Sequence, residues 1–185
     1  MSKFYDPDRE RVMVDIETLG IEPGAAVLSI GAVTFDTDGI GAQFHRSIDL
    51  QSCQDAGLAI DAETLQWWLD QDGDARAVLT GGDPLADVLA AFTEFVPEDA
   101  EVWANGPQFD CEHLEAAYAA VDMDAPWTFR DERDVRTVRA LPVAPDVEQD
   151  GTEHDALDDA VYQARIVGEA LNRLESGEWG GGDGV

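Results

Sequence analysis

The stretch VMVDIETLG, residues 12–20, decides the fold of this 185-residue chain. Its apolar start, residues 12–16, predicts a short β-strand that ends in acidic residues. Side chains alternate across a strand, so Asp15 and Glu17 are expected to point to the same face. Two carboxylates on one face repel each other unless a cation lies between them, and such hard oxygen ligands suit Mg²⁺ or Mn²⁺.

The Asp-x-Glu pattern alone is weak evidence in so acidic a chain. It occurs six times, starting at residues 8, 15, 61, 99, 110 and 146. The pair at Asp15 and Glu17 is distinguished by its context, because it follows an apolar strand and precedes residues 18–20, Thr-Leu-Gly. An exposed acid pair without a function would not need that strand.

Hydrophobic periodicity along the rest of the chain predicts an α/β fold. Further strands are expected at 26–35, 42–49 and 102–105, with helices at 62–71, 85–95, 108–121, 133–141 and 155–174. Turn residues at 36–39 predict a hairpin between the second and third strands, and the polar segment 142–153 predicts a loop. We therefore expect a mixed central sheet, antiparallel in its first three strands and flanked by helices.

Length and composition indicate one globular domain, since 44% of the residues are apolar. We expect a charged leader at residues 1–11, the folded domain at 12–175 and a flexible glycine-rich tail at 176–185. No signal peptide or membrane span is predicted, which suggests a cytoplasmic protein without a membrane partner. Cys53 and Cys111 predict two reduced thiols.

The charge of the chain is extreme: 40 acidic residues against 11 basic ones give a net charge of −29. Such a charge destabilises a compact fold by self-repulsion, but at about 1 M salt the Debye length falls to ~3 Å and screens it. The acids are spread over the whole chain, which favours a high-salt cytoplasm, as in a haloarchaeon or one of its viruses. The alternative is an acidic protein that recruits a basic partner.

Two further acidic positions fall at expected element boundaries. The stretch WANGPQFD, residues 103–110, combines a strand end, a Gly-Pro turn and Asp110 on the first turn of a helix. In HDALDD, residues 154–159, His154 lies just before a helix and Asp159 just inside it. Taken singly, Asp110 can be a charge that stabilises a helix N-terminus, and His154 a surface histidine.

Taken together, these three elements resemble the motifs of the DEDDh 3′–5′ exonuclease superfamily, which includes ribonuclease T, oligoribonuclease and the proofreading subunit of bacterial DNA polymerase III. The order is Asp-x-Glu, Asn-x-x-x-Phe-Asp and His-x-x-x-x-Asp. A narrower branch, with the T-even phage exodeoxyribonuclease A and mycobacterial ribonuclease AS, is more similar still. The similarity lies in the segments VDIETLG, WANGPQFD, FRDERDVRT and HDALDDAVYQA. The resemblance covers residues 12–170 and implies an RNase H-like exonuclease fold.

The resemblance also implies a chemistry: hydrolysis of phosphodiesters from the 3′ end of single-stranded DNA or RNA. Asp15, Glu17 and Asp159 would hold the first of two Mg²⁺ or Mn²⁺ ions, and Asp15 would bridge to the second, supported by Asp110. The two cations would stabilise the attacking and leaving oxygens. His154 would act as general base, a role that suits imidazole near neutral pH. Related enzymes are often dimers, which leaves a homodimer open.

Several side chains are candidates for substrate contacts. Thr18 and Leu19 would cradle the terminal nucleotide, and by the resemblance Leu19 would wedge between bases. Asn105 can bond the sugar–phosphate, with Phe109 packed beside it. The neighbouring Trp67 and Trp68 point about 100° apart on a helix. We expect Trp67 to be exposed and to stack on a base. The alternative, in which both tryptophans belong to the core, is equally compatible with the sequence.

Four arginines, at positions 130, 133, 136 and 139, predict a phosphate track in which Arg136 is the main contact. Their alternative role is local ion pairing with the acids between them.

Two other functions remain for comparison. A catalytically silent nucleic-acid-binding module is disfavoured because all five expected catalytic residues are present. An RNase H-like endonuclease is disfavoured by the histidine spacing. The sequence leaves open whether the substrate is DNA or RNA, since one or two donor or acceptor groups are enough to recognise a 2′-OH.

Overall fold

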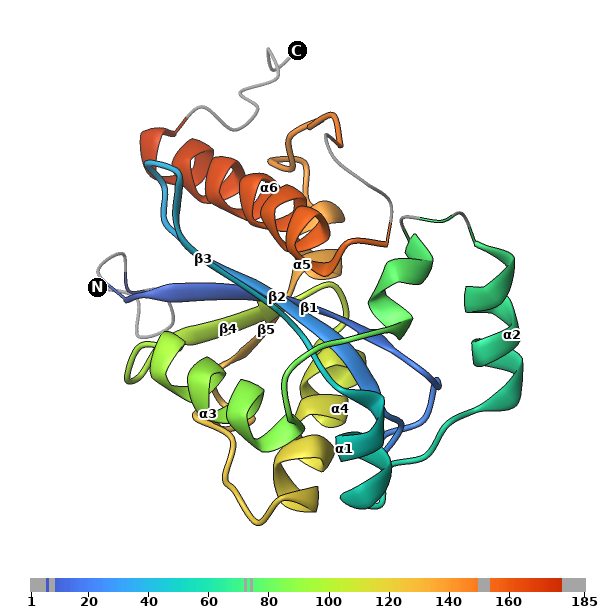
Figure 1. Cartoon of the computed structure of the whole chain (residues 1–185). Coiled ribbons are helices and arrows are strands. Elements are labelled where there is room, and N and C mark those ends of the chain that lie inside the picture. Colours follow the sequence, from blue (N-terminus) through green and yellow to red (C-terminus); the bar gives the residue numbers. More distant parts are fainter. Residues whose placement is uncertain (1–5, 7–8, 72, 74, 150–153, 178–185) are drawn as a thin grey trace.

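The computed structural model describes residue 6 and residues 9–71, 73, 75–149 and 154–177. These residues form the predicted α/β arrangement, one mixed sheet with helices on both faces (Figure 1). The five strands of the described region are β1 (Arg11–Thr18), β2 (Val27–Phe35), β3 (Ile40–Ser47), β4 (Glu101–Ala104) and β5 (Glu132–Asp134).

The strand order is β3-β2-β1-β4-β5, which puts β1 in the middle of the sheet. β1, β2 and β3 pair antiparallel, as predicted, whereas β4 and β5 run parallel to β1. The turn between β2 and β3 is held by the Asp36 carboxylate, which accepts hydrogen bonds from the backbone N–H groups of Asp38 and Gly39 at 2.8 and 2.9 Å. Asp36 thus terminates β2 and starts the hairpin.

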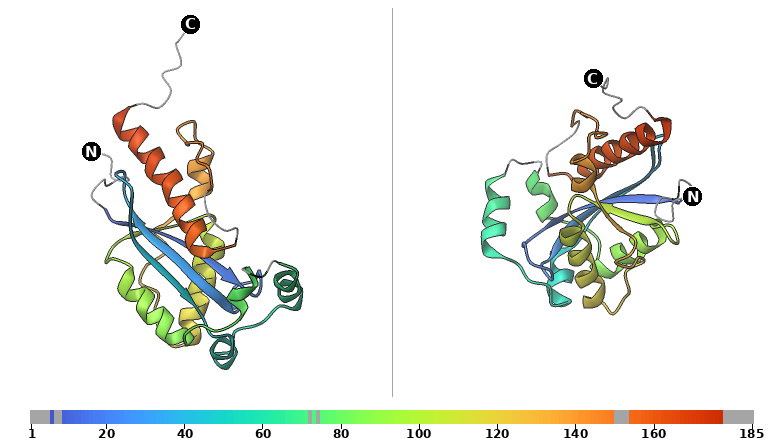
Figure 2. Two further views of the ribbon diagram at one scale, coloured as in Figure 1. Left: turned by 45° about the horizontal axis from the view of Figure 1, so that its top comes forward. Right: turned by 180° about the vertical axis from the view of Figure 1, so that it is seen from behind.

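The helices of the described region are α1 (Leu50–Asp55), α2 (Ala62–Asp70), the 3₁₀-helix η1 (Ala75–Leu79), α3 (Leu85–Phe95), α4 (Pro107–Ala120), α5 (Val135–Arg139) and α6 (Ala156–Ser176). Four of them form the layers on the two faces of the sheet. α5 and α6 cover one face, and α3 and α4 cover the other (Figure 2). α2 lies beyond the end of β1, where the Trp68 indole Nε1 donates to the Thr18 carbonyl at 3.0 Å.

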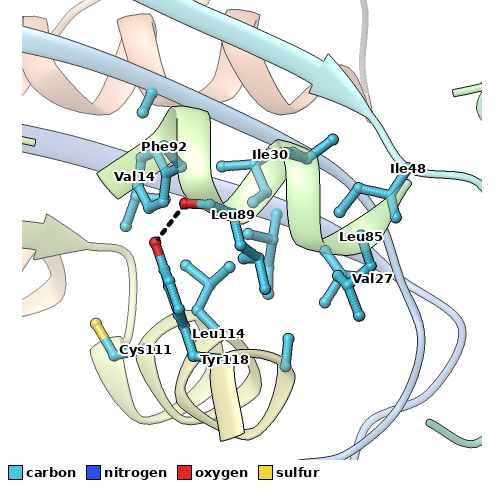
Figure 3. Packing of buried hydrophobic residues seen from close by; sticks show 14 of the residues in the cluster. Val14, Val27, Ile30, Ile48, Leu85, Leu89, Phe92, Cys111, Leu114 and Tyr118 are labelled. Carbon is cyan, nitrogen blue, oxygen red and sulfur yellow. Dashed lines mark hydrogen bonds between the residues drawn. The ribbon is translucent and has the colours of Figure 1, made fainter. Parts of the chain in front are cut away.

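Alternation along β1 divides the core between the two layers. Val12, Val14 and Ile16 point into the larger cluster, under α3 and α4. In that cluster the Tyr118 hydroxyl donates to the Leu89 carbonyl at 3.1 Å (Figure 3). Met13 points the other way and packs beneath α6. Asp15 and Glu17 follow Met13 at intervals of two, so the acids belong to the α6 face.

The structure corrects the prediction in one region. Residues 133–141 were expected to form one helix, but Glu132–Asp134 pair with β4 as an edge strand, and α5 begins only after them. The reason is that these three residues gain hydrogen bonds along the edge of β4, and the Asp134 side chain then caps α5 by accepting from the Arg136 N–H at 2.9 Å. The short helices α1 and η1 were not predicted.

The remaining expectations concern the chain ends and the thiols. The predicted leader and tail lie mostly outside the described residues, although Arg11 already belongs to β1 and Ser176 to α6. In the predicted loop, residues 142–149 contain no helix or strand, and residues 150–153 lie outside the description. Cys53 and Cys111 are free and buried. None of the described helices combines the length and apolarity that a membrane crossing requires.

Candidate active site

The acidic site forms where α6 begins against the middle of the sheet. Asp15 of β1 pairs with Gly31 of β2. A Cβ atom on Gly31 would lie 2.1 Å from the backbone carbonyl carbon of Ala156, so only glycine lets the start of α6 approach this closely. Asp155 caps the helix by accepting from the N–H groups of Leu157 and Asp158 at 3.0 and 3.1 Å. The first turn of α6 therefore meets the acids of β1.

Three of the predicted ligands come together there. One carboxylate oxygen from each of Asp15, Glu17 and Asp159 lies within 4.8 Å of the other two. Hard oxygen donors at such mutual distances suit Mg²⁺ or Mn²⁺. The cluster joins two segments more than 140 residues apart, as the combined motifs predicted, and it fits a divalent cation.

Burial and mutual repulsion raise the pKa values of these carboxyl groups. Burial and, to a smaller extent, the charge of Asp159 raise the pKa of Glu17 to about 8. Burial likewise raises the pKa of Asp15 well above its usual range, with contributions from Asp110, Glu17 and Asp159. Burial is also the main cause of the raised pKa of Asp159. A divalent cation would remove the reason for protonation by supplying positive charge between the carboxylates.

Asp110 lies beside this cluster on the first turn of α4. Burial raises the pKa of Asp110 to about 7, although the backbone N–H groups of Asp110 and Ile16 stabilise its ionised form. Its carboxylate does not belong to the close set of Asp15, Glu17 and Asp159, but its charge acts directly on Asp15. The structure thus places three acids together and the fourth next to Asp15.

His154, the predicted base, lies between the loop and the N-cap of α6. Its backbone is left-handed, with φ of +64°. The imidazole lies edge-on to the indole of Trp67, with ring centroids 4.9 Å apart, and 6.2 Å from the ring of Trp68. A positive charge on His154 lowers the pKa of Asp159, so the two side chains are electrostatic neighbours.

The first motif and α2 hold the next candidates. Trp67 is 44% exposed and Trp68 is buried, as we expected of this pair. Thr18 is buried, and its hydroxyl donates to the Gly20 carbonyl at 2.7 Å. Leu19 departs from the prediction of a wedge between bases. Its side chain is fully buried in the core because the chain turns inward after β1, where the Leu19 N–H donates to Ala26 at 2.8 Å.

Asn105 and Arg136 meet at the end of β4. The Arg136 guanidinium donates to the Asn105 carbonyl at 2.7 Å and lies against Gly106, where a Cβ atom would come within 2.0 Å of it. Gly106 has φ of +109°, which glycine adopts readily. The Asn105 Oδ1 is buried without a hydrogen-bond partner among the described residues. Phe109 is partly buried against the core.

The other arginines of the predicted phosphate track have partners within the protein. Arg133 forms an ion pair with Glu101 at 3.0 Å, an acid of β4 and not one of the acids between the arginines. Arg139 donates to the Tyr162 hydroxyl at 2.9 Å, and Arg130 stacks on Phe129.

Two glutamines that contact the acids were missed. Gln163 donates to Asp15 Oδ1 at 2.8 Å, and Gln149 donates to Asp159 Oδ1 at 2.6 Å. A signal for Gln163 exists, because it follows Asp159 by four residues and so shares its helix face. Gln149 belongs to a loop, and no pattern in the sequence places it.

Comparison with known proteins identifies the relatives of this site. The profile of the family described as "3'-5' exoribonuclease Rv2179c-like domain" matches residues 10–171. No curated protein sequence matches the chain. The nuclease domain of 3'hExo, described as a DEDDh family member bound to rAMP, aligns at 13% identity over 96% of both chains, with a TM-score of 0.62. Cell-death related nuclease 4 (CRN-4) aligns at 14% identity over 90% of this chain and 64% of its own, with a TM-score of 0.51.

Proposed function

This chain belongs to the Rv2179c-like 3′–5′ exoribonuclease domain family, and we propose that it shortens single strands from the 3′ end with two bound divalent cations. Family membership makes it a 3′–5′ exonuclease, and its RNase H-like fold is that of a DEDDh nuclease, as the motifs predicted. The narrower resemblance to the phage exodeoxyribonuclease A and ribonuclease AS branch stays a prediction.

The observation that carries the proposal is the cluster of Asp15, Glu17 and Asp159, with oxygens within 4.8 Å of one another. We assign these three side chains to the first cation, and Asp15 with Asp110 to the second. Cations bound there would stabilise charge on the attacking and leaving oxygens of the phosphodiester. The partial burial of these three acids supports this role, because charges that water screens less act more strongly on the reacting groups.

We assign the general base to His154. Its imidazole is held against the Trp67 ring and lies close enough to Asp159 to act on that carboxylate. A base beside the acidic cluster can accept the proton of a water molecule as that water attacks the phosphorus. The left-handed backbone of His154 is a costly conformation for a residue other than glycine, and such strain is concentrated at functional sites.

For the substrate we propose a single strand, with RNA favoured over DNA. The matching family is described as exoribonucleases, and the 3'hExo structure contains rAMP. The exposed face of Trp67 suits stacking on a base, which contributes about 1–3 kcal/mol. The exposed guanidinium of Arg136 lies at the end of β4, near enough to lower the pKa of Asp110, and suits a phosphate.

The test is digestion of matched 5′-labelled RNA and DNA oligomers with Mn²⁺ at high KCl. We expect a ladder of products shortened from the 3′ end, faster for RNA, and no products with EDTA or with Asp15→Ala. A labelled circular single strand should stay intact, whereas cleavage of the circle would favour the endonuclease. Binding without cleavage in any condition would favour the silent module.

A further inference from the structure

The side chain of Gln163 lies in an unusual place for an amide. It is 5% exposed and belongs to the face of α6 that packs on the sheet. Its neighbours on that face, Ala160, Ala164 and Val167, are buried apolar residues of the core cluster under α6. Burial of an amide in such surroundings is unfavourable unless it makes hydrogen bonds, so this position calls for a specific partner.

That partner is the central acid of the site. Gln163 Nε2 donates to Asp15 Oδ1 at 2.8 Å, across 148 residues of sequence. Gln163 lies one helical turn after Asp159, so the helix that supplies one ligand also holds the carboxylate of another. Among the described residues, Gln163 is the one whose side chain donates a hydrogen bond to Asp15.

The bond fixes how Asp15 presents its carboxylate. With Oδ1 held by the amide, rotation of the carboxylate is restrained and Oδ2 is left for other ligands. When a bound cation keeps Asp15 ionised, the donor faces Asp15, because the reverse orientation of the amide would place Oε1 against the carboxylate, oxygen against oxygen. Groups that hydrogen-bond to a ligand orient it and tune its affinity for the ion.

The amide oxygen of Gln163 supports the same role. Gln163 Oε1 is buried and has no hydrogen-bond partner among the described residues. Buried acceptors are normally satisfied, so an exception of this kind calls for a donor from outside the described part of the chain. Water molecules carried by a hydrated Mg²⁺ or Mn²⁺ ion are donors of that kind.

We propose that Gln163 is a positioning residue that holds the Asp15 carboxylate in the orientation that binds a divalent cation. The proposal rests on the proposed function, because it requires that Asp15 is a metal ligand. A purely structural amide would stabilise the fold without affecting the affinity for metal, and the two roles therefore separate by experiment.

The experiment compares Mn²⁺ binding by calorimetry in the metal-free full chain and in Gln163→Met, which keeps the length of the side chain but removes the donor. We expect the affinity to fall about 10- to 100-fold, and activity at low Mn²⁺ to fall with it and recover in excess Mn²⁺. The matched control is Val167→Ala, which perturbs the same face of α6 without touching an acid. It should lose stability and keep wild-type affinity.

The outcomes are distinguishable. Wild-type affinity in a folded Gln163→Met protein overturns the positioning role alone, whereas a wild-type chain that takes up no Mn²⁺ overturns the proposed function as well. If Gln163→Met does not fold, Gln163→Asn decides, because it keeps an amide but withdraws it by one methylene. Weakened Mn²⁺ binding by that variant supports the proposal, and unchanged binding overturns it.

Discussion

The imidazole of His154 lies edge-on to the indole of Trp67, with ring centroids 4.9 Å apart and planes at 85°. This contact joins α2 to the start of α6. Trp68 anchors the arrangement, since it is buried and donates to the Thr18 carbonyl at the end of β1. Because the backbone of His154 is left-handed, with φ of +64°, we infer that the aromatic contact helps to hold a strained base in place.

Replacement of Trp67 by alanine should therefore lower kcat as well as raise KM. Loss of the ring leaves His154 less well oriented, and misplacement of a catalytic group by about 1 Å can reduce the rate about 100-fold. Trp67→Phe should retain much of kcat, because a smaller ring keeps an aromatic edge. Steady-state kinetics at saturating Mn²⁺ measure both parameters.

The control for this series is Leu69→Ala, which removes another exposed apolar side chain of α2. It should leave kcat unchanged. A Trp67→Ala protein with normal kcat and only a higher KM would limit the role of Trp67 to stacking on a base.

Asp15→Ala and His154→Ala should separate metal binding from proton transfer. Asp15 contributes to the acidic cluster, so Asp15→Ala should abolish both Mn²⁺ binding and activity. His154→Ala should keep Mn²⁺ affinity within a few-fold while turnover falls about 10²- to 10⁴-fold, the usual contribution of a general base. Calorimetry and single-turnover hydrolysis measure the two effects, and His45→Ala, on the exposed strand β3, is the matched control. Full activity in Asp15→Ala would refute the assignment.

The sequence pattern predicted the structure correctly where a single strand or helix determines where its residues lie. Alternation on β1 placed Asp15 and Glu17 on one face, and the periodicity of residues 85–95 matched α3 at both ends. Pattern failed where distant contacts decide. β5 forms by pairing with β4, about 30 residues earlier in the chain, and Leu19 is buried because the chain turns inward after β1. Both depend on three-dimensional packing that neighbouring residues do not encode.

The same distinction applies to the site. The motifs predicted which acids would meet, because their order and spacing carry the resemblance. They did not predict that Gly31 lets α6 touch the sheet, or that Gln163 holds Asp15. These two contacts arise between elements far apart in the sequence, so only the assembled fold reveals them.

Gly106→Ala should weaken substrate binding through Arg136. The new methyl group would need the space of the guanidinium, within 2.0 Å, and the backbone at φ +109° resists a side chain. We expect a higher KM, because Arg136 is displaced from the Asn105 carbonyl, and a lower melting temperature. Gly24→Ala is the matched control, since Gly24 also has a positive φ of +93° but open space around it.

The two glycine variants should lose stability to a similar degree, by about 1–2 kcal/mol from backbone strain. Only Gly106→Ala should also reduce the salt dependence of RNA binding, because it removes a phosphate contact. Equal KM values for the two variants would argue against a substrate role for Arg136.

Without metal, the protein should become less stable as the pH rises from about 5 to 8. The pKa of Glu17 is raised by burial from 4.5 to about 8, so between these values the folded chain holds a proton that the unfolded chain has lost. The stabilisation is complete below pH 4.5 and is lost as the pH passes through the folded pKa. Each such proton changes the free energy of unfolding by at most about 1.4 kcal/mol per pH unit.

Urea unfolding of EDTA-treated protein across this pH range measures the effect. Saturating Mn²⁺ should flatten the profile, because the cation takes the place of the protons. Glu17→Gln should reduce the slope in the absence of metal, since the amide does not titrate while Asp15, Asp110 and Asp159 still do. A metal-free stability that rises with pH, or identical profiles for wild type and Glu17→Gln, would contradict this account.

The net charge of −29 predicts that stability depends strongly on salt. We propose that the chain is adapted to a high-salt cytoplasm, in which a Debye length of about 3 Å at 1 M salt screens its self-repulsion. The melting temperature should therefore be markedly higher in about 2 M KCl than in about 0.1 M KCl. Chloride is the better choice of anion, because sulfate also strengthens the burial of apolar surface. A chain that melts at the same temperature in both solutions is not salt-adapted, and its acids would then be better explained by recruitment of a basic partner.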